Sequence, residues 1–349
     1  MPAIGQSNDR HSFPVIDRMS LLNRDMFGVL NLVIRRAATG VLLVLCLLTL
    51  VFILAHSAPG NPITVMLSPT IPQSAANVMR KHYGLDKAIL SQYFLWLRSC
   101  LQGDFGISIS HQRPVGELIA SFLPNTALLA LAAIVIEFVS GIALGIVAAR
   151  YKKKWLDQVI SQTCMVLYAV PTFWIGIVLV TMFSYILGLL PSSQMLSVGA
   201  DNLPAGERFL DVGKHLLLPA VTIAIPGGAA ITRYLRANLL RIQDEEFILY
   251  ARSYGISRRR IFYSYELPNV AGPIITLFGL EIGTLLTGAL VTETIYAWPG
   301  MGRLAVMAIV SRDYPLIMGC TIVAGVVVII GNFMADIIYI LVDPRVRMR

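Results

Sequence analysis

Three carboxylic acids lie inside long apolar stretches of the sequence: Glu137, Glu281 and Asp336. An ionised group in hydrocarbon is costly, so carboxylates within a membrane span usually face protein or water. Such residues could carry protons or line the path of a solute, as they do in proton-coupled transporters and channels. They could equally hold neighbouring helices or subunits together through a hydrogen bond. The residue types leave both interpretations open.

Motifs for covalent chemistry or nucleotide binding are absent from the sequence. The P-loop pattern GxxxxGK[ST] does not occur, and neither do GxSxG or HExxH. The five histidines are scattered, and the four cysteines show neither CxxC nor metal-ligand spacing. We therefore predict no catalytic, cofactor-binding or metal-binding residues in this chain, which is not an enzyme on this interpretation.

The stretch IQDEEFILYARSYGISRRRIFYSYELP, residues 242–268, combines charged and apolar side chains in a pattern that could bind a partner. Its acidic start, residues 244–246, favours the first turn of a helix, where the helix dipole attracts negative charge. Phe247, Ala251 and Tyr254 then fall on one side of this helix and give it an apolar face.

A glycine and a serine predict how this stretch bends. Gly255 stands where a helix commonly ends in a left-handed residue. Ser257 can cap a second helix that starts at Arg258, and Leu267-Pro268 would end that helix and open the next span. The residues predicted to contact a partner are Phe247, Ala251, Tyr254, Gly255, Ser257, Arg258, Arg259, Ile261, Phe262, Leu267 and Pro268.

Three interpretations of this stretch compete. An ordinary internal loop of a membrane protein needs only the positive charges, and a site for anionic lipid or nucleic acid needs basic residues and an apolar face. A compact helix–glycine–helix plan favours a protruding element that fits a groove in a partner protein.

The elements that would position these residues are membrane-spanning helices. Hydrophobic residues make up 56% of the 349-residue chain and charged residues only 14%, with a mean hydropathy of +0.70. Soluble domains carry about 25% charged residues, so this composition predicts an all-α polytopic membrane protein. Six apolar runs are long enough to cross: 38–55, 126–149, one within 159–190 that Pro171 should break, 216–234, 269–291 and 316–342.

The distribution of Lys and Arg predicts the orientation of these spans. The N-terminal tail, the second and fourth loops between spans and the C-terminal tail carry 19 of the 28 basic residues. The side rich in Lys and Arg is normally cytoplasmic, so both termini, 1–32 and 344–349, should be cytoplasmic. The net charge of +8 then needs no nucleic acid. External segments include Ser57–Asn125, of about 70 residues, and the predicted gate or turn at Trp298, Pro299, Gly300 and Gly302.

The stretch 242–268 also resembles the "EAA" loop of the membrane subunits of binding-protein-dependent ABC importers, E-A-A-x-x-x-G, nine residues, then I-x-L-P. With Gly255 at the motif glycine, Ala251, Leu267 and Pro268 match as well. Leu249, Tyr250 and Tyr265 replace the motif's Glu, its first Ala and its Ile.

Further stretches resemble the dipeptide/oligopeptide/nickel branch of these permeases, in the same order along the chain. They are APGNP (58–62), YGLD (83–86), GDFG (103–106), ARSYGISRRRIF (251–262), ETIYAWPGMGRL (293–304), RDYP (312–315) and DIIYILVDPRVR (336–347). The resemblance covers residues 33–347 and leaves the tail before them outside.

The resemblance implies the six-span MetI-like fold of a type I importer in a bacterial inner membrane. Residues 33–121 would form the first helix with a long periplasmic loop, and residues 122–343 the transmembrane core. Its coupling loop, residues 243–268, would dock on an ATPase. The implied partners are a second permease, two cytoplasmic ATPases that bind ATP and Mg, a periplasmic or lipid-anchored solute-binding protein, and membrane lipids.

The implied mechanism is alternating access, in which ATP binding closes the ATPases and the coupling loop carries that motion towards an external gate. The branch transports short peptides, nickel or metal chelators, glutathione and other small solutes, and no residue here selects among them. The alternative from the residues alone is a proton-coupled transporter or channel that uses Glu137, Glu281 and Asp336.

Overall fold

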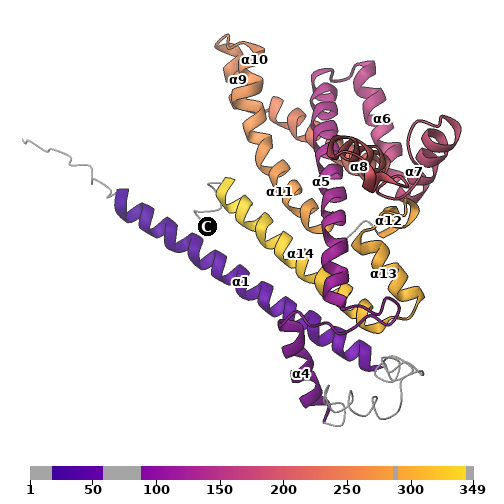
Figure 1. Cartoon of the computed structure of the whole chain (residues 1–349). Helices are drawn as coiled ribbons and strands as arrows, with labels where there is room; N and C mark the ends of the chain where they lie inside the picture. The colour runs from indigo at the N-terminus through magenta and orange to yellow at the C-terminus, as the bar shows by residue number, and fades with distance from the viewer. Residues whose placement is uncertain (1–17, 58–87, 286–289, 343–349) are drawn as a thin grey trace, which may run out of the picture.

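The computed structural model describes residues 18–57, 88–285 and 290–342, which form α-helices joined by turns (Figure 1). The helices are α1 (Arg18–Ser57), α4 (Ile89–Leu101), α5 (Val115–Arg150), α6 (Trp155–Ala169), α7 (Thr172–Leu179), α8 (Ala205–Gln243), α9 (Glu246–Ser253), α10 (Arg258–Ile261), α11 (Leu267–Leu285), α12 (Leu290–Ile295), α13 (Met301–Val310) and α14 (Tyr314–Val342). Two π-helical stretches, Val180–Ile186 and Phe262–Glu266, follow α7 and α10 directly. The predicted all-α fold class is confirmed.

Four of these helices, α1, α5, α8 and α14, are long and apolar enough to cross a membrane. A fifth candidate crossing is bent, because α6 and the helix formed by α7 with its π-helical continuation to Ile186 meet at an angle of 104°. The break falls at Val170 and Pro171, where a helix loses a main-chain donor, so the predicted interruption is confirmed. The fifth predicted span, residues 269–291, coincides with α11 and the start of α12. Residues 286–289 lie outside the described chain, so this complete crossing stays a prediction.

Several helices extend well beyond their apolar runs. Helix α5 begins at Val115 rather than at residue 126, and α8 covers residues 205–243 rather than 216–234. Hydropathy marks only the part of a helix that can face hydrocarbon, whereas main-chain hydrogen bonds carry the helix into the polar flanks. Pro219 and Pro226 lie inside α8 and do not end it, as membrane helices often allow.

Helices α5 and α8 approach closely because α5 has two glycines, four residues apart, on the contact face. A Cβ atom at Gly141 would lie 2.8 Å from Cβ of Ile231 and 3.0 Å from the carbonyl oxygen of Gly228. A Cβ atom at Gly145 would lie 3.0 Å from Cβ of Leu235. Small residues at this spacing are typical of packed membrane helices, whose attraction depends on close contact.

We expect Gly141→Ala to destabilise the folded protein by about 1–3 kcal/mol, the usual cost of overpacking. The added methyl group meets a main-chain oxygen and a Cβ atom, neither of which can turn away. Thermal unfolding of the detergent-solubilised protein measures the effect. Gly213→Ala is the matched control, because this glycine of α8 has open space around it. Equal melting temperatures for both variants would contradict the close approach.

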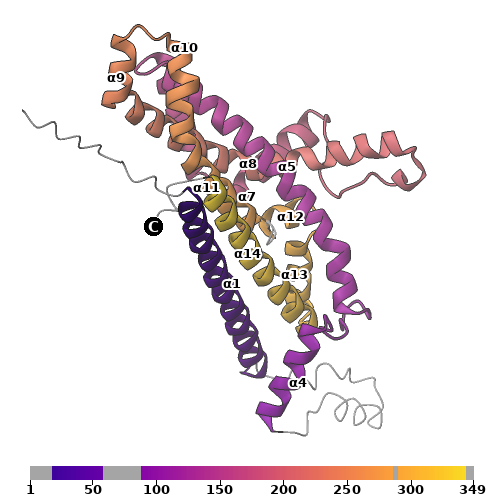
Figure 2. The same ribbon diagram turned by 90° about the vertical axis from the view of Figure 1, so that its left-hand side faces the viewer.

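The two ends of the molecule differ in character. Helices α9 and α10 project at one end, and α4 lies at the opposite end, near the turn between α13 and α14 (Figure 2). Helix α1 lies alongside α14 in both views, on the outside of the bundle. The predicted coupling loop and the predicted external segments are therefore separated by the length of the spans.

A buried carboxylate, Asp313, joins the segment before α5 to the start of α14. Its Oδ2 atom accepts hydrogen bonds from Ser108 Oγ (2.6 Å) and from the main chain and side chain of Ser110. Its Oδ1 atom accepts one from the main-chain N–H of Leu316. Burial alone would raise the pKa of Asp313, but these hydrogen bonds outweigh it and hold the pKa below its ordinary value. The segment is thus tied down by an ionised side chain.

Candidate functional site

The coupling loop has the helix–glycine–helix form predicted from its sequence. Helix α9 ends at Ser253, and Gly255 has a φ of +73°, in the left-handed region. Ser257 caps α10, since its Oγ atom accepts a hydrogen bond from the main-chain N–H of Arg260 at 3.4 Å. These local predictions are confirmed.

The predicted end of the second helix at Leu267-Pro268 is wrong. Helix α10, the π-helical stretch Phe262–Glu266 and α11 follow one another without a break. The wider π turn bonds the N–H of Leu267 to the carbonyl oxygen of Phe262. Pro268 lies just beyond this turn, on the first turn of α11, where its missing N–H does not interrupt the chain.

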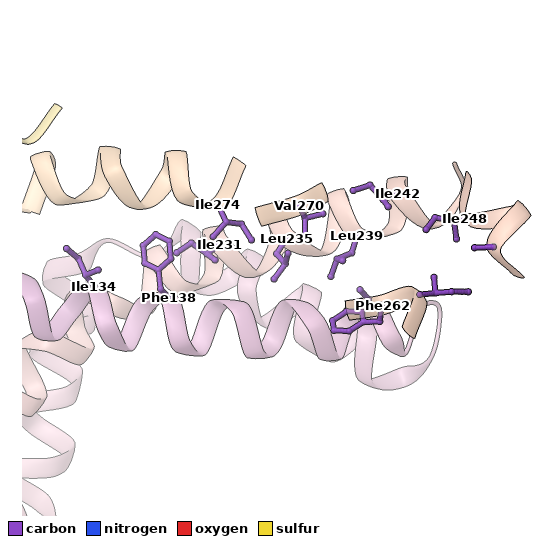
Figure 3. Packing of buried hydrophobic residues seen from close by; sticks show 13 residues of the cluster. Ile134, Phe138, Ile231, Leu235, Leu239, Ile242, Ile248, Phe262, Val270 and Ile274 are labelled. Carbon is purple, nitrogen blue, oxygen red and sulfur yellow. The ribbon is translucent and has the colours of Figure 1, made fainter. Parts of the chain in front are cut away.

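Inward-facing residues fuse the coupling loop to the membrane helices. Ile248, Ala251, Ile261 and Phe262 are all buried, and they extend a hydrophobic row between α5, α8 and α11 (Figure 3). We call this set the central row: Ile134, Phe138, Ala149, Ile231, Leu235, Leu239, Ile242, Ile248, Ala251, Ile261, Phe262, Val270 and Ile274. Close packing resists compression, so the loop and these helix ends form one stiff body.

The structure narrows the surface that the coupling loop offers to a partner. Ala251, Ile261 and Phe262 were predicted to contact a partner, but they fill the interior of the loop instead. The prediction took Phe247, Ala251 and Tyr254 as one apolar stripe. In the structure the inward side of α9 passes through Ile248 and Ala251, because the central row offers them apolar neighbours.

The outward side of α9 carries apolar side chains that nothing in the described chain covers. We call it the docking face: Phe247, Leu249, Tyr250 and Tyr254, which are 40%, 52%, 63% and 84% exposed. Leu249 and Tyr250 are the residues that depart from the EAA motif. Large exposed aromatic side chains in a group are typical of binding surfaces.

Basic residues surround this face. Arg258, Arg259 and Arg260 are exposed on α10, and Arg252 is exposed on α9. Arg150, at the end of α5, places its guanidinium carbon 4.7 Å from the centre of the Phe262 ring, a cation–π contact that pins the loop to α5. Leu267 packs against the central row, and Pro268 is exposed.

The intramembrane carboxylates are placed differently from one another. Glu137 on α5 is 3% exposed and lies against α8, where a Cβ atom at Gly227 would be 2.3 Å from its carboxyl carbon. Within the described residues its Oε2 atom has no hydrogen-bond partner. Glu281 on α11 is half-buried and near enough to act electrostatically on Glu137. Asp336 belongs to α14, but its side chain lies outside the described part. The tight fit over Gly227 favours the packing interpretation for Glu137.

A second buried network occupies the far end of the molecule, in residues 292–303, which we call the external cap. Its centre is Glu293, a fully buried carboxylate that joins three elements. Thr126 Oγ1 of α5 donates a hydrogen bond to its Oε1 atom at 2.9 Å, and the N–H of Arg303 on α13 donates to Oε2 at 3.0 Å. The N–H of Met301 in turn donates to Thr126 Oγ1 at 2.7 Å.

The residues predicted as an external gate or turn fold over Glu293. Trp298 is fully buried and donates from Nε1 to the carbonyl oxygen of Asn125, whose side chain donates to the carbonyl oxygen of Pro299. A Cβ atom at Gly300 would lie 2.5 Å from the Glu293 carboxyl group, and one at Gly302 would lie 2.7 Å from Cα of Leu290. Both glycines are therefore required by close contact.

The external cap also forms hydrogen bonds with α7, the second half of the bent helix pair, and with α8. Tyr296 Oη donates a hydrogen bond to the carbonyl oxygen of Gly176 on α7 at 3.2 Å, and it lies 2.8 Å from Thr222 Oγ1 on α8. Glu293 and Tyr296 were not singled out in the sequence. Their partners lie on helices far away in the chain, and only the position of Glu293 beside an apolar run hinted at burial.

The architecture defines a helical membrane protein with a rigid, aromatic coupling loop at one end and a buried cap at the other. Residues 29–130 and 141–348 match two family descriptions: binding-protein-dependent transport system membrane component, N-terminal, and binding-protein-dependent transport system inner membrane component. The chain belongs to the family of binding-protein-dependent transport system inner membrane components. It is a permease subunit of an ABC importer, not an enzyme, and such an importer works with ATPase and substrate-binding partners.

Relatives match nearly the whole chain. It is 37% identical to the oligopeptide transport system permease protein AppB of Bacillus subtilis, over 90% of this chain and 98% of that protein. It is 33% identical to the probable D,D-dipeptide transport system permease protein DdpB of Escherichia coli, over 90% and 97%. It is 34% identical to the di/tripeptide transport system permease protein DppB of Pseudomonas aeruginosa, over 85% and 93%. The predicted resemblance to the peptide permease branch is confirmed.

Solved structures confirm the fold. An inward-facing structure of the MetNI methionine ABC transporter matches with a TM-score of 0.53 and 14% sequence identity, over 65% of this chain and 96% of that one. This likeness shows the MetI-like fold alone. Family and fold together do not favour the alternative of a proton-coupled transporter or channel.

Proposed function

We propose that this chain forms half of the translocation pathway of an importer for short peptides. Its partners are a second permease, two cytoplasmic ATPases and an external solute-binding protein, and both of its termini are cytoplasmic. The observation that carries the substrate class is the set of relatives named for oligopeptide, D,D-dipeptide and di/tripeptide transport, each matched over nearly its whole length.

The coupling loop docks on one of the ATPases through the docking face. Its aromatic side chains provide the apolar centre of the contact, and the surrounding arginines fit a groove with an acidic rim. Because the loop is packed into the central row, ATP-driven closure of the ATPases moves the cytoplasmic ends of α5, α8 and α11 together. The external cap then forms part of the gate at the other end.

The proposal is tested by reconstituting the chain with its second permease, ATPases and binding protein in liposomes and measuring uptake of radiolabelled trialanine. We expect accumulation that requires ATP and the binding protein, since neither membrane chain can supply energy itself. The triple variant Glu137→Gln, Glu281→Gln and Asp336→Asn should keep substantial uptake. Loss of uptake in that variant with normal ATP hydrolysis would support ion coupling instead, and absence of uptake in the unmodified complex would reject the peptide class.

A further inference from the structure

A buried ion pair joins the first half of the broken span to α8. Arg236 of α8 donates from Nε to Oδ1 of Asp157 and from Nη2 to Oδ2 at 2.9 Å, a two-bond contact between planar groups. The Asp157 side chain is 3% exposed and that of Arg236 is 30% exposed. A paired geometry of this kind fixes direction as well as distance between two helices.

The same carboxylate organises the start of α6. Asp157 Oδ2 accepts a hydrogen bond from the main-chain N–H of Lys153 at 2.9 Å, and Oδ1 accepts one from Ser161 Oγ at 3.3 Å. Asp157 therefore holds the turn that enters α6 and the first turns of α6 in one arrangement. A displacement of Arg236 should therefore also displace the beginning of α6.

Arg236 belongs to the stiff body that contains the coupling loop. In the sequence of α8 it directly follows Leu235 and precedes Leu239 by three residues, and both leucines are fully buried members of the central row. The same row includes Ile248 of α9 and Ile261 of α10. Motion of the coupling loop is therefore delivered to the guanidinium group of Arg236 through close-packed side chains.

The second half of the broken span is attached at the other end of the molecule. Helix α7 contacts the external cap through the hydrogen bond between Gly176 and Tyr296. Between the two attachments lies the 104° break, where Val170 and Pro171 have extended backbone angles. Such a short extended link between helices is where a change of angle is absorbed most easily.

We propose that the Asp157–Arg236 pair is the joint through which the coupling loop moves α6 and α7, and so links ATP hydrolysis to the external cap. These are positioning residues, because each acts through the helix that it holds. The inference rests on the proposed function, because it assigns a part of that transport cycle. A second contact between α8 and α6, in which Arg233 lies 5.8 Å from the centre of the Tyr168 ring, does not involve the joint.

The test replaces both charges at once, since removing one alone would leave a buried charge without a partner. In the reconstituted complex, Asp157→Asn with Arg236→Gln should lower trialanine uptake per ATP hydrolysed by about tenfold, a typical strength of coupling between sites. ATP hydrolysis itself should persist. The exchanged pair, Asp157→Arg with Arg236→Asp, should restore most of the lost uptake per ATP. Lys152→Gln is the control, because it breaks an exposed ion pair with Asp244 nearby.

A second readout does not depend on the solute. A spin label at Phe173→Cys on α7, in a variant without the four native cysteines, should change its spectrum on ATP binding. The double neutral variant should lose this change, and the exchanged pair should regain it. Unaltered uptake per ATP and an unaltered spectral change in the double neutral variant would overturn the joint. If the unmodified complex fails to transport trialanine, the peptide proposal fails, whereas the spectral arm still decides about the joint.

Discussion

Replacing Tyr250 and Tyr254 together by alanine should abolish uptake by releasing the ATPases from the permease. Both side chains are largely exposed on the docking face, yet α9 beneath them is fixed by Ile248 and Ala251 in the central row. Central aromatic residues usually carry much of the affinity of an interface, so binding should weaken by at least about tenfold. Co-purification of the ATPases in detergent and ATP-driven uptake measure the two consequences.

Tyr185→Ala serves as the control for this double variant. Tyr185 is 86% exposed but belongs to the stretch after α7, away from the coupling loop. It should leave ATPase binding unchanged, because the loss of an exposed aromatic ring alone has little effect on the fold. If the docking-face variant still retains its ATPases, the contact must lie elsewhere on the loop, and the assignment of this face is rejected.

Substitutions at Gly300 and Glu293 in the external cap should have a large effect on the stability of the fold. In Gly300→Ala the new methyl group would lie 2.5 Å from the Glu293 carboxyl group, which is fully enclosed and has little room to withdraw. We expect a loss of about 1–3 kcal/mol of stability from overpacking. Glu293→Gln should lower the stability by about 1–3 kcal/mol as well. Both carboxylate oxygens of Glu293 accept hydrogen bonds, so the amide N–H of glutamine would face another donor and leave that donor without an acceptor.

Thermal unfolding of the assembled complex checks both cap variants. Gly206→Ala is the control for the glycine, since nothing lies near the added methyl group. Thr126→Ser keeps the hydroxyl that bridges Glu293 and Met301, so it should be tolerated far better than Thr126→Val. Equal melting temperatures for the Gly300→Ala complex and the unmodified complex would contradict the close contact between Gly300 and Glu293.

The local form of the coupling loop was predictable because it depends on local rules. A left-handed Gly255, a capping Ser257 and an acidic start each act within a few residues of the chain. Which side of α9 faces inward was not predictable in this way. Ile248 turns inward because Leu239 and Ile242 of α8 are there to receive it, and the sequence pattern of α9 alone also allows the stripe through Phe247.

The external cap shows the same limit more strongly. Trp298, Gly300 and Gly302 could be recognised as a turn, but the reason for the glycines is a carboxylate that sequence analysis passed over. Glu293 is bound by Thr126, which lies 167 residues earlier in the chain. Contacts between residues so far apart in the chain depend on how the spans assemble. The break at Pro171, in contrast, was predictable because the proline ring removes a main-chain donor wherever it occurs.

The unbroken run from α10 through the π-helical stretch into α11 has a mechanical consequence. Residues 258–285 form one rod of about 42 Å, at about 1.5 Å per residue. A tilt of only about 5° about one end of a rod of that length displaces the other end by about 4 Å. The arginines lie at the docking end of this rod, so a small rotation about that end becomes a shift of about 4 Å at the membrane-embedded end of α11.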